Sequence, residues 1–153
     1  MSCFQDNNHT HIHKCCFCYS DTMKEIIGTV CFFVQDTKVL LAEIEYPDGK
    51  KLWNGVGGVV DDNETPLEGV IREISEETML RVDKNGIDEA TVINLRGLEL
   101  HVFIAHEWSG ELIALDPTLK RFRWFEFNQI PYGQMHIGND TWLPGILDKV
   151  SKN

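Results

Sequence analysis

The chain has 153 residues, enough for one globular domain with a substantial core and too few for two comfortable ones. Apolar residues make up 42% of it and charged residues 25%, a balance that excludes a disordered protein. The formal net charge of −10 gives it no general attraction for nucleic acid or for an anionic membrane, so neither is an expected partner.

No apolar run approaches the roughly 20 residues that cross a bilayer, and the N-terminal region lacks the apolar segment of a secretory signal. Most of the cysteines lie close to the start of the chain, which is not the spacing of a disulfide framework. We therefore expect a cytoplasmic protein with reduced thiols.

Residues 1–22 show neither helical nor strand periodicity and mix histidines with cysteines. We expect an unpacked extension there, followed by one domain over residues 23–153. A tract rich in His and Cys can hold a soft metal, but this one lacks paired C-x-x-C spacing, which argues against a functional zinc site.

The domain begins with two predicted strands. β-Branched and aromatic residues over 26–34 and 38–44 favour a hairpin of buried strands. A Pro-Asp-Gly turn at 47–49 follows, and then the run WNGVGG at 53–58, whose glycines permit backbone conformations that other residues resist. We expect something to approach that backbone closely.

A helix is predicted from Thr65 to about Thr78. Thr65 is a good N-cap, Pro66 suits the first helical position, and Glu68 is placed to complete a capping box. Side chains at helical spacing predict a stripe that packs on a sheet, formed by Leu67, Val70, Ile71, Ile74 and Thr78.

Two more strands and a last helix complete the pattern. The strands are expected over 98–108 and 121–127, and the helix over about 141–150 with Asp140 as its cap. Helices and strands interleave without an internal repeat, so the expected fold class is α/β.

The first predicted helix carries carboxylates on one face, at Glu73, Glu76 and Glu77. At about 100° per residue they share a sector beside the apolar stripe. Their mutual repulsion would become attraction around a divalent cation, and carboxylate oxygens suit Mg²⁺ or Mn²⁺, which can also bind substrate phosphates. The alternative is a solvated acidic face of the helix.

The spacing of the surrounding residues argues against that alternative. From Gly58, five residues lead to Glu64, and seven more lead to the run REISEE at 72–77. This resembles the Nudix box, the signature of hydrolases that act on a nucleoside diphosphate linked to another moiety. Met79 stands where the family has glycine, and a non-glycine residue held at positive φ costs roughly 1–2 kcal/mol.

The resemblance implies the Nudix fold, a mixed β-sheet sandwiched between α-helices. It also implies that Glu73, Glu76 and Glu77 bind metal with help from the Gly57 carbonyl, and that Arg72 holds these glutamates in shape. Glu73 is the first candidate for the general base that activates the attacking water. The implied cofactor is Mg²⁺, with Mn²⁺ as a second choice.

Beyond the box, the chain is similar to animal MutT homologues that hydrolyse oxidised purine nucleoside triphosphates. The similarity is carried by residues 53–58, 101–103, 123–131, Met135 and 142–144. It implies a substrate site that includes Gly58 and a base pocket in which Asn54 contacts the base edge, with Thr29 and Phe33 on the strand of the pocket.

The similarity weakens where the base is chosen. Those relatives follow the methionine with tryptophan, proline and two aspartates, whereas this chain has His136, Ile137, Gly138 and Asn139, with Asp140 one place later. Gly138 and Asn139 are neutral, so they cannot make the protonation-dependent hydrogen bonds that the two aspartates of those relatives can make. Asn139 and Asp140 are therefore candidate base contacts, and the preferred purine stays open.

The expected function is Mg²⁺-dependent hydrolysis of a purine nucleoside triphosphate such as 8-oxo-dGTP to the monophosphate and pyrophosphate. Two alternatives stay open: a Nudix hydrolase of a nucleotide sugar or dinucleotide, and a nucleotide-binding module without turnover. The intact glutamates favour an enzyme, while Met79 and a loop at 115–120 whose only carboxylate is Asp116 favour a module. A monomer and a homodimer are both compatible with the sequence.

Overall fold

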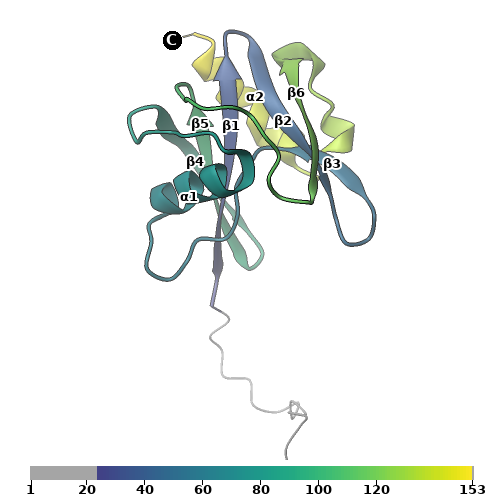
Figure 1. Cartoon of the computed structure of the whole chain (residues 1–153). Helices are drawn as coiled ribbons and strands as arrows, with labels where there is room; N and C mark the ends of the chain where they lie inside the picture. The colour runs from purple at the N-terminus through teal and green to yellow at the C-terminus, as the bar shows by residue number, and fades with distance from the viewer. Residues whose placement is uncertain (1–23, 153) are drawn as a thin grey trace, which may run out of the picture.

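The structure is a computed structural model that describes residues 24–152. The described residues form six strands and two α-helices, and two short 3-10 helices, η1 (Phe127–Gln129) and η2 (Tyr132–Gln134), lead from β6 to α2. Figure 1 shows how the strands and α-helices are arranged. The extension expected over residues 1–22 lies outside the described residues, so its lack of packing and the domain boundary at residue 23 stay predictions.

The predicted hairpin is present. β1 (Ile26–Gln35) and β2 (Lys38–Glu45) pair antiparallel, and Asp36 takes a positive φ of 53° in the turn between them. Residues 28–34 of β1 are all buried, which requires cover on both faces of the strand. The continuous apolar run that predicted this strand is the mark of that double burial.

Two strands were not predicted from the sequence. β3 (Lys51–Asn54) is only 4 residues long, and β4 (Ile87–Leu95) is an edge strand whose side chains are mostly exposed. Neither carries the long apolar run or the clean alternation that signals a strand in a sequence. Both are held by pairing with a neighbouring strand, β3 with β2 and β4 with β5 (Leu98–Ala105).

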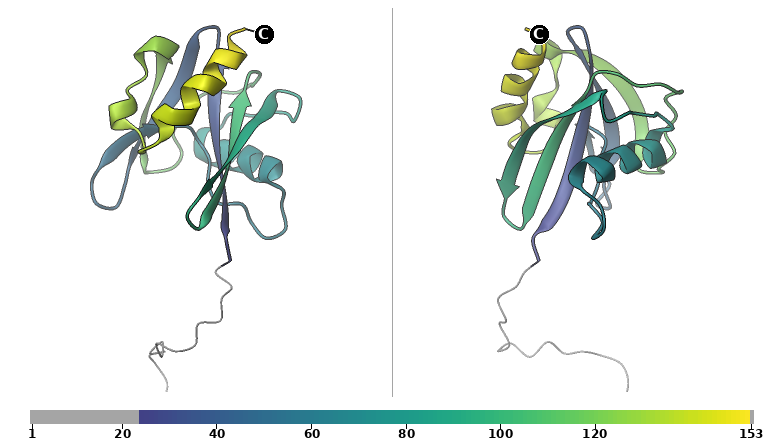
Figure 2. Two further views of the ribbon diagram at one scale, coloured as in Figure 1. Left: turned by 180° about the vertical axis from the view of Figure 1, so that it is seen from behind. Right: turned by 90° about the vertical axis from the view of Figure 1, so that its left-hand side faces the viewer.

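The strands form one mixed sheet in the order β3-β2-β1-β5-β4, and β6 (Leu119–Glu126) also pairs with β2. β1 and β5 run parallel, while the other strand pairs are antiparallel. The two helices, α1 (Pro66–Thr78) and α2 (Asn139–Val150), cover opposite faces of this sheet, as Figure 2 shows. The predicted α/β fold, with its sheet between helices, is confirmed.

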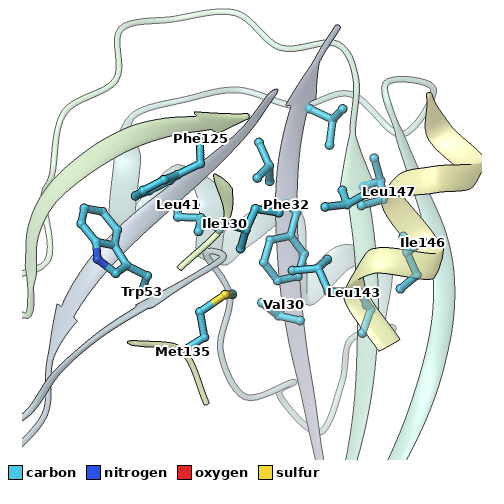
Figure 3. Packing of buried hydrophobic residues seen from close by; sticks show 14 residues of the cluster. Val30, Phe32, Leu41, Trp53, Phe125, Ile130, Met135, Leu143, Ile146 and Leu147 are labelled. Carbon is cyan, nitrogen blue, oxygen red and sulfur yellow. The ribbon is translucent and has the colours of Figure 1, made fainter. Parts of the chain in front are cut away.

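Each face of the sheet has its own hydrophobic core. On the α2 face, Leu143 and Leu147 point toward β1 and pack in one cluster with Phe32, which is fully buried (Figure 3). On the α1 face, Val70 and Ile74 are fully buried in a second cluster. The stripe predicted for the first helix is therefore the side of α1 that packs on the sheet.

The two helices begin differently. At α1 the Thr65 hydroxyl accepts the Glu68 N–H at 3.2 Å, and the Glu68 carboxylate accepts the Thr65 N–H at 2.7 Å, which is the predicted capping box. The prediction that Asp140 caps α2 was wrong. That helix starts at Asn139, two residues earlier than expected, because Gly138, at a left-handed φ of 100°, turns the chain into the helix without a side-chain cap.

Neither α1 nor α2 has the length and apolar character needed to cross a bilayer, within the residues that the structure describes.

Candidate active site

The loop between β3 and α1 runs very close to β1 and to α1. The Thr29 N–H donates to the Gly58 carbonyl at 2.8 Å. A Cβ on Gly57 would lie 2.2 Å from the Thr29 carbonyl oxygen, and one on Gly58 would lie 2.6 Å from the Glu73 carboxylate. The close approach expected of this glycine run is therefore made by the backbone of β1 and by a glutamate of α1.

Arg72 lies at the centre of the acidic residues. Its Nε and Nη2 donate to both carboxylate oxygens of Glu64, at 3.0 and 2.6 Å. Its Nη1 donates to Glu73 at 2.9 Å and to Glu76 at 3.2 Å, and its Nη2 also donates to the Val59 carbonyl at 3.2 Å. One guanidinium thus joins the loop to three carboxylates, and its hydrogen bonds to Glu64 do most to raise the pKa of Arg72.

Glu64 connects the glycine loop to α1. Besides Arg72, it accepts the Asp61 N–H at 2.9 Å. Gly69 allows the approach, because a Cβ there would lie 2.9 Å from Glu64 Oε1. The hydrogen bonds from Arg72 are the main reason that the pKa of Glu64 falls to about 2. Glu64 is therefore ionised at neutral pH and anchors the loop.

Glu77 is partly buried among other negative charges. The pKa of Glu77 rises to about 7, mainly because the carboxyl group is buried and also because of the charges of Glu73, Asp116 and Glu76. A hydrogen bond from the Gly57 backbone opposes this rise. A carboxyl group that holds its proton near neutral pH marks a place where added positive charge is favourable.

A cavity of about 650 Å³ opens on the α2 face of the sheet, and the glycine loop forms part of its wall. This volume is in the range of small-molecule sites. Most of the lining is apolar, from β4, β5 and the segment that leads into α2. Polar side chains gather at Asn54, Asn139, Tyr46 and His136.

The structure brings most of the expected base-site residues to this cavity. Thr29, Asn54, Gly58 and Asn139 line it, together with the proposed metal-binding Gly57. These positions come from β1, β3, the glycine loop and α2.

Two expected residues do not line the cavity. Phe33 is 1% exposed in the core beneath α1, where its ring packs edge-on against Trp108 at 5.2 Å between centroids. It shares the strand of Thr29, but only Thr29 lies at the glycine loop, where its hydroxyl donates to the Gly58 carbonyl at 3.2 Å. Asp140 is exposed, because it follows Asn139 on the first turn of α2 and therefore points to a different side of the helix.

Comparison with known proteins identifies the family. The family description "NUDIX domain" matches residues 25–146 of the chain. The chain belongs to the Nudix family. Oxidized purine nucleoside triphosphate hydrolases from Danio rerio and from Mus musculus are each 32% identical to it over 125 residues, which cover 79% of this chain and 79% of each relative.

Solved Nudix structures share the architecture. A MutT NUDIX hydrolase from Burkholderia pseudomallei superimposes with a TM-score of 0.66 at 25% identity, over 82% of this chain and 97% of that one. The resemblance found in the Nudix box is thus supported over the whole domain, and the predicted family and fold are confirmed.

In this structure the three glutamates of the Nudix box do not surround a common point. Within residues 24–152, no three His, Cys, Asp or Glu side chains are grouped closely enough to hold a metal ion. Glu73 and Glu76 are turned toward Arg72, and Glu77 receives its hydrogen bond from Gly57. The donor chemistry, carboxylate oxygens with excess negative charge around Glu77, fits Mg²⁺ or Mn²⁺. Glu76 is free to turn, because its side chain is 59% exposed.

Asp116 is a part of the site whose position could not be deduced from the sequence. Its loop lies against the end of α1, where the Leu115 N–H donates to the Glu77 carbonyl at 2.8 Å. The Asp116 carboxylate accepts the N–H and the hydroxyl of Thr118 at 2.7 and 2.6 Å, which lowers its pKa and keeps it ionised. It therefore adds negative charge beside Glu77. Nothing in the local pattern of either segment signals this contact.

Tyr46 and His136 were also missed as partners. Tyr46 Oη lies 2.5 Å from His136 Nε2, and the two rings meet edge-on with centroids 5.2 Å apart. Burial and the nearby charge of Lys50 lower the pKa of His136, so its ring is neutral and Nε2 accepts the Tyr46 proton. This pair ties the end of β2 to the loop before α2 at the Nudix cavity.

Proposed function

We propose that this Nudix protein is a hydrolase that converts an oxidised purine nucleoside triphosphate, such as 8-oxo-dGTP, to the monophosphate and pyrophosphate. The observation that carries the proposal is the position of the glycine loop. Gly57 and Gly58 line the cavity on one side, while Gly58 touches Glu73 of α1 on the other. A base in the cavity would therefore place its phosphates beside the carboxylates.

The relatives support the substrate class. The relatives from Danio rerio and Mus musculus, which align over 79% of this chain, are oxidized purine nucleoside triphosphate hydrolases. The cavity is also large enough for a nucleoside, and its apolar walls suit the faces of a purine ring.

Glu73, Glu76 and Glu77, with the Gly57 carbonyl, would hold Mg²⁺ or Mn²⁺, which when bound offsets the phosphate charge and lowers the pKa of the attacking water. Arg72 keeps Glu73 at the glycine loop through the hydrogen bond at 2.9 Å. We assign Glu73 as the general base that accepts the proton of the water as it attacks a phosphorus. The cavity would hold the purine ring of the substrate, and this would orient the phosphates for the attack of the water.

A nucleotide-binding role without turnover is the competing function. It is favoured by the hydrogen bonds from Arg72 to Glu73 and Glu76, because Glu76 would have to leave its bond before the three glutamates could face one cation. The two functions differ in whether product appears.

The deciding experiment is a substrate panel with Mg²⁺. The protein would be incubated with 8-oxo-dGTP, dGTP, a nucleotide sugar and ADP-ribose, and the release of monophosphate and pyrophosphate measured. We expect 8-oxo-dGTP to have the highest kcat/KM. Equal or faster turnover of dGTP or ADP-ribose would overturn the substrate class, and no turnover of any compound would support the binding role.

The metal site is tested with Glu76→Gln and Glu77→Gln. Each change removes a charge without changing the size of the side chain, and we expect kcat to fall at least about 100-fold at ordinary Mg²⁺ concentrations. Glu111→Gln, at an exposed position outside this site, is the matched control and should keep full activity. Activity that survives both changes at Glu76 and Glu77 would remove these residues from the metal site.

A further inference from the structure

Three strands of the sheet, β3, β6 and β4, each pair with only one neighbouring strand within residues 24–152. β3 is 4 residues long, and β6 carries the basic side chains of Lys120, Arg121 and Arg123. Short edges and charged edges are two ways in which proteins keep a strand from pairing with another chain. β4 has 9 residues, so its length does not protect it.

Only the first half of β4 is protected. It carries Asp88 and Glu89, and a bulge lies between Glu89 and Thr91. Charges and bulges both interrupt pairing at a sheet edge. The second half, Thr91–Leu95, has no charge, no proline and no bulge. The sheet ends at this strand, as the right-hand view of Figure 2 shows.

The second half of β4 also exposes apolar side chains on both faces of the sheet. Val92 pairs with His101 on the α1 face and is 37% exposed, whereas Leu95 lines the cavity on the α2 face and is 50% exposed. Between them, Ile93 packs against the core of the α2 face. Exposed apolar side chains beside a free strand edge are typical of a surface that meets another chain.

This segment can pair with itself. If Thr91–Leu95 of two copies align antiparallel over their whole length, Ile93 lies opposite Ile93, and Thr91 lies opposite Leu95. The paired side chains then point to the same face of the joined sheet, so the apolar residues of one copy meet those of the other. The acidic residues of the first half of β4 stay outside the paired segment.

The charges at the two ends of the segment are complementary in this alignment. Arg96 lies opposite Ala90 of the second copy and beside its Glu89. Arg96 is the only lysine or arginine between residues 87 and 105, and it makes no ion pair within the described part of the chain. The net charge of −10 on each copy opposes association weakly, because physiological salt screens charges more than about 8 Å apart.

We propose that the chain forms a homodimer in which the β4 strands of two copies pair antiparallel about a two-fold axis at Ile93, so that two sheets become one. The pairing supplies hydrogen bonds to the free edge and covers Val92 and Leu95. Because Leu95 lines the Nudix cavity, Thr91 of the second copy extends the wall of that cavity. Dimerisation does not require the proposed hydrolysis and is measured without nucleotide.

The first test is sedimentation equilibrium of the full chain in reducing buffer. Because the paired segment is short, we expect a weak dimer whose mass rises from 17.5 kDa toward twice that value between about 5 and 500 µM. A mass of one chain over the whole range would overturn the proposal.

Val92→Lys tests which surface forms the dimer. The two lysines would lie close together across the axis, and edge lysines prevent strand pairing, so we expect at least about tenfold weaker association. Val59→Lys is the matched control, because Val59 is 60% exposed and contacts β1 at Gly28, away from β4. Circular dichroism would show that both variants fold. A dimer that Val92→Lys leaves intact would contradict the proposed interface.

Ile93→Cys tests the alignment of the two strands. In the proposed pairing the two Cβ atoms at this position lie about 5 Å apart, so a disulfide needs only a small adjustment. Mild oxidation should link two copies through residue 93, as peptide mapping by mass spectrometry would show. Val59→Cys should give no link between its own two copies. A dimer that cannot be linked at residue 93 would refute the pairing about Ile93.

Discussion

Met79 ends α1 in a left-handed conformation, with φ 58° and ψ 0°. The Nudix family has glycine at this position, and glycine adopts that conformation without strain. The Met79 side chain is 49% exposed, so its packing offsets little of the cost. α1 therefore ends in the left-handed conformation that a glycine would adopt, and Met79 adopts it with strain.

Met79→Gly should therefore stabilise the protein by about 1 kcal/mol, because the strain relieved exceeds the entropy that glycine adds to the unfolded chain. The free energy of unfolding would be measured by urea denaturation. Met79→Ala is the matched control, since it shortens the side chain but keeps the Cβ that causes the strain. A glycine variant no more stable than the alanine variant would contradict this account.

The Glu64 carboxylate makes a pH-dependent contribution to stability. Its pKa falls from an ordinary 4.5 to about 2, mainly through hydrogen bonds from Arg72. A carboxyl whose pKa is lower in the folded state stabilises the protein above its unfolded pKa, and this stabilisation is lost as the pH falls through the folded pKa. Glu64→Gln should be less stable than wild type at pH 7, by an amount that shrinks between about pH 4.5 and pH 2. Urea unfolding of both proteins at several pH values checks this, and a constant difference would refute it.

At the level of elements, α1 was predicted with its boundaries and its buried face, whereas β4 was not predicted at all. The capping box of Thr65 and Glu68 and the stripe of α1 act over a few neighbouring residues, so they are legible in the sequence. The residues of β4 are mostly exposed, and the strand exists because it pairs with β5. Edge strands of this kind leave little local signal.

Alanine substitutions at the two neighbouring glycines of the loop, Gly57 and Gly58, should have different outcomes. A Cβ on Gly57 meets the backbone carbonyl of Thr29 at 2.2 Å, so Gly57→Ala must move β1 or the loop and should cost about 1–3 kcal/mol or more. A Cβ on Gly58 meets the carboxylate of Glu73, which can swing away. Gly58→Ala should therefore keep most of its stability and lose activity, by roughly 100-fold if Glu73 shifts by about 1 Å.

Urea denaturation and kcat/KM measured on both variants separate these effects. Gly145→Ala is the control, because a Cβ there meets nothing within 4 Å inside α2. It should gain about 0.5–1 kcal/mol from better helix propensity and keep its activity. If Gly58→Ala is fully active, the close contact with Glu73 has no part in the reaction.

On the scale of the whole molecule, one sheet separates two cores that face different helices. Ile74 is fully buried on the α1 face, and Ile146 is 9% exposed on the α2 face. Both cores use side chains of β1, which point alternately to the two faces (Figure 3 shows the α2 side). The two faces are thus joined through the strands and should unfold together.

Ile74→Val and Ile146→Val should each lower the free energy of unfolding by about 0.5–1.5 kcal/mol. Because the two sites share no partner across the sheet, the double variant should lose the sum of the two values to within about 0.5 kcal/mol. Urea unfolding followed by fluorescence and by circular dichroism would measure this. A larger deviation from the sum would show that the two cores are energetically coupled. Transitions that do not coincide between the two probes would show that the cores do not unfold as one cooperative unit.

The sequence by itself determined β1, β2, α1 and the Nudix box, because caps, turns, apolar spacing and motif spacing all act between near neighbours in the chain. Through resemblance it also named five of the residues that line the cavity: Thr29, Asn54, Gly57, Gly58 and Asn139. Only the tertiary structure decided that Phe33 packs under α1, that Asp116 lies beside Glu77 and that Tyr46 meets His136. These contacts join residues far apart in sequence, and such contacts are set by how the helices and loops pack on the sheet, which no local pattern encodes.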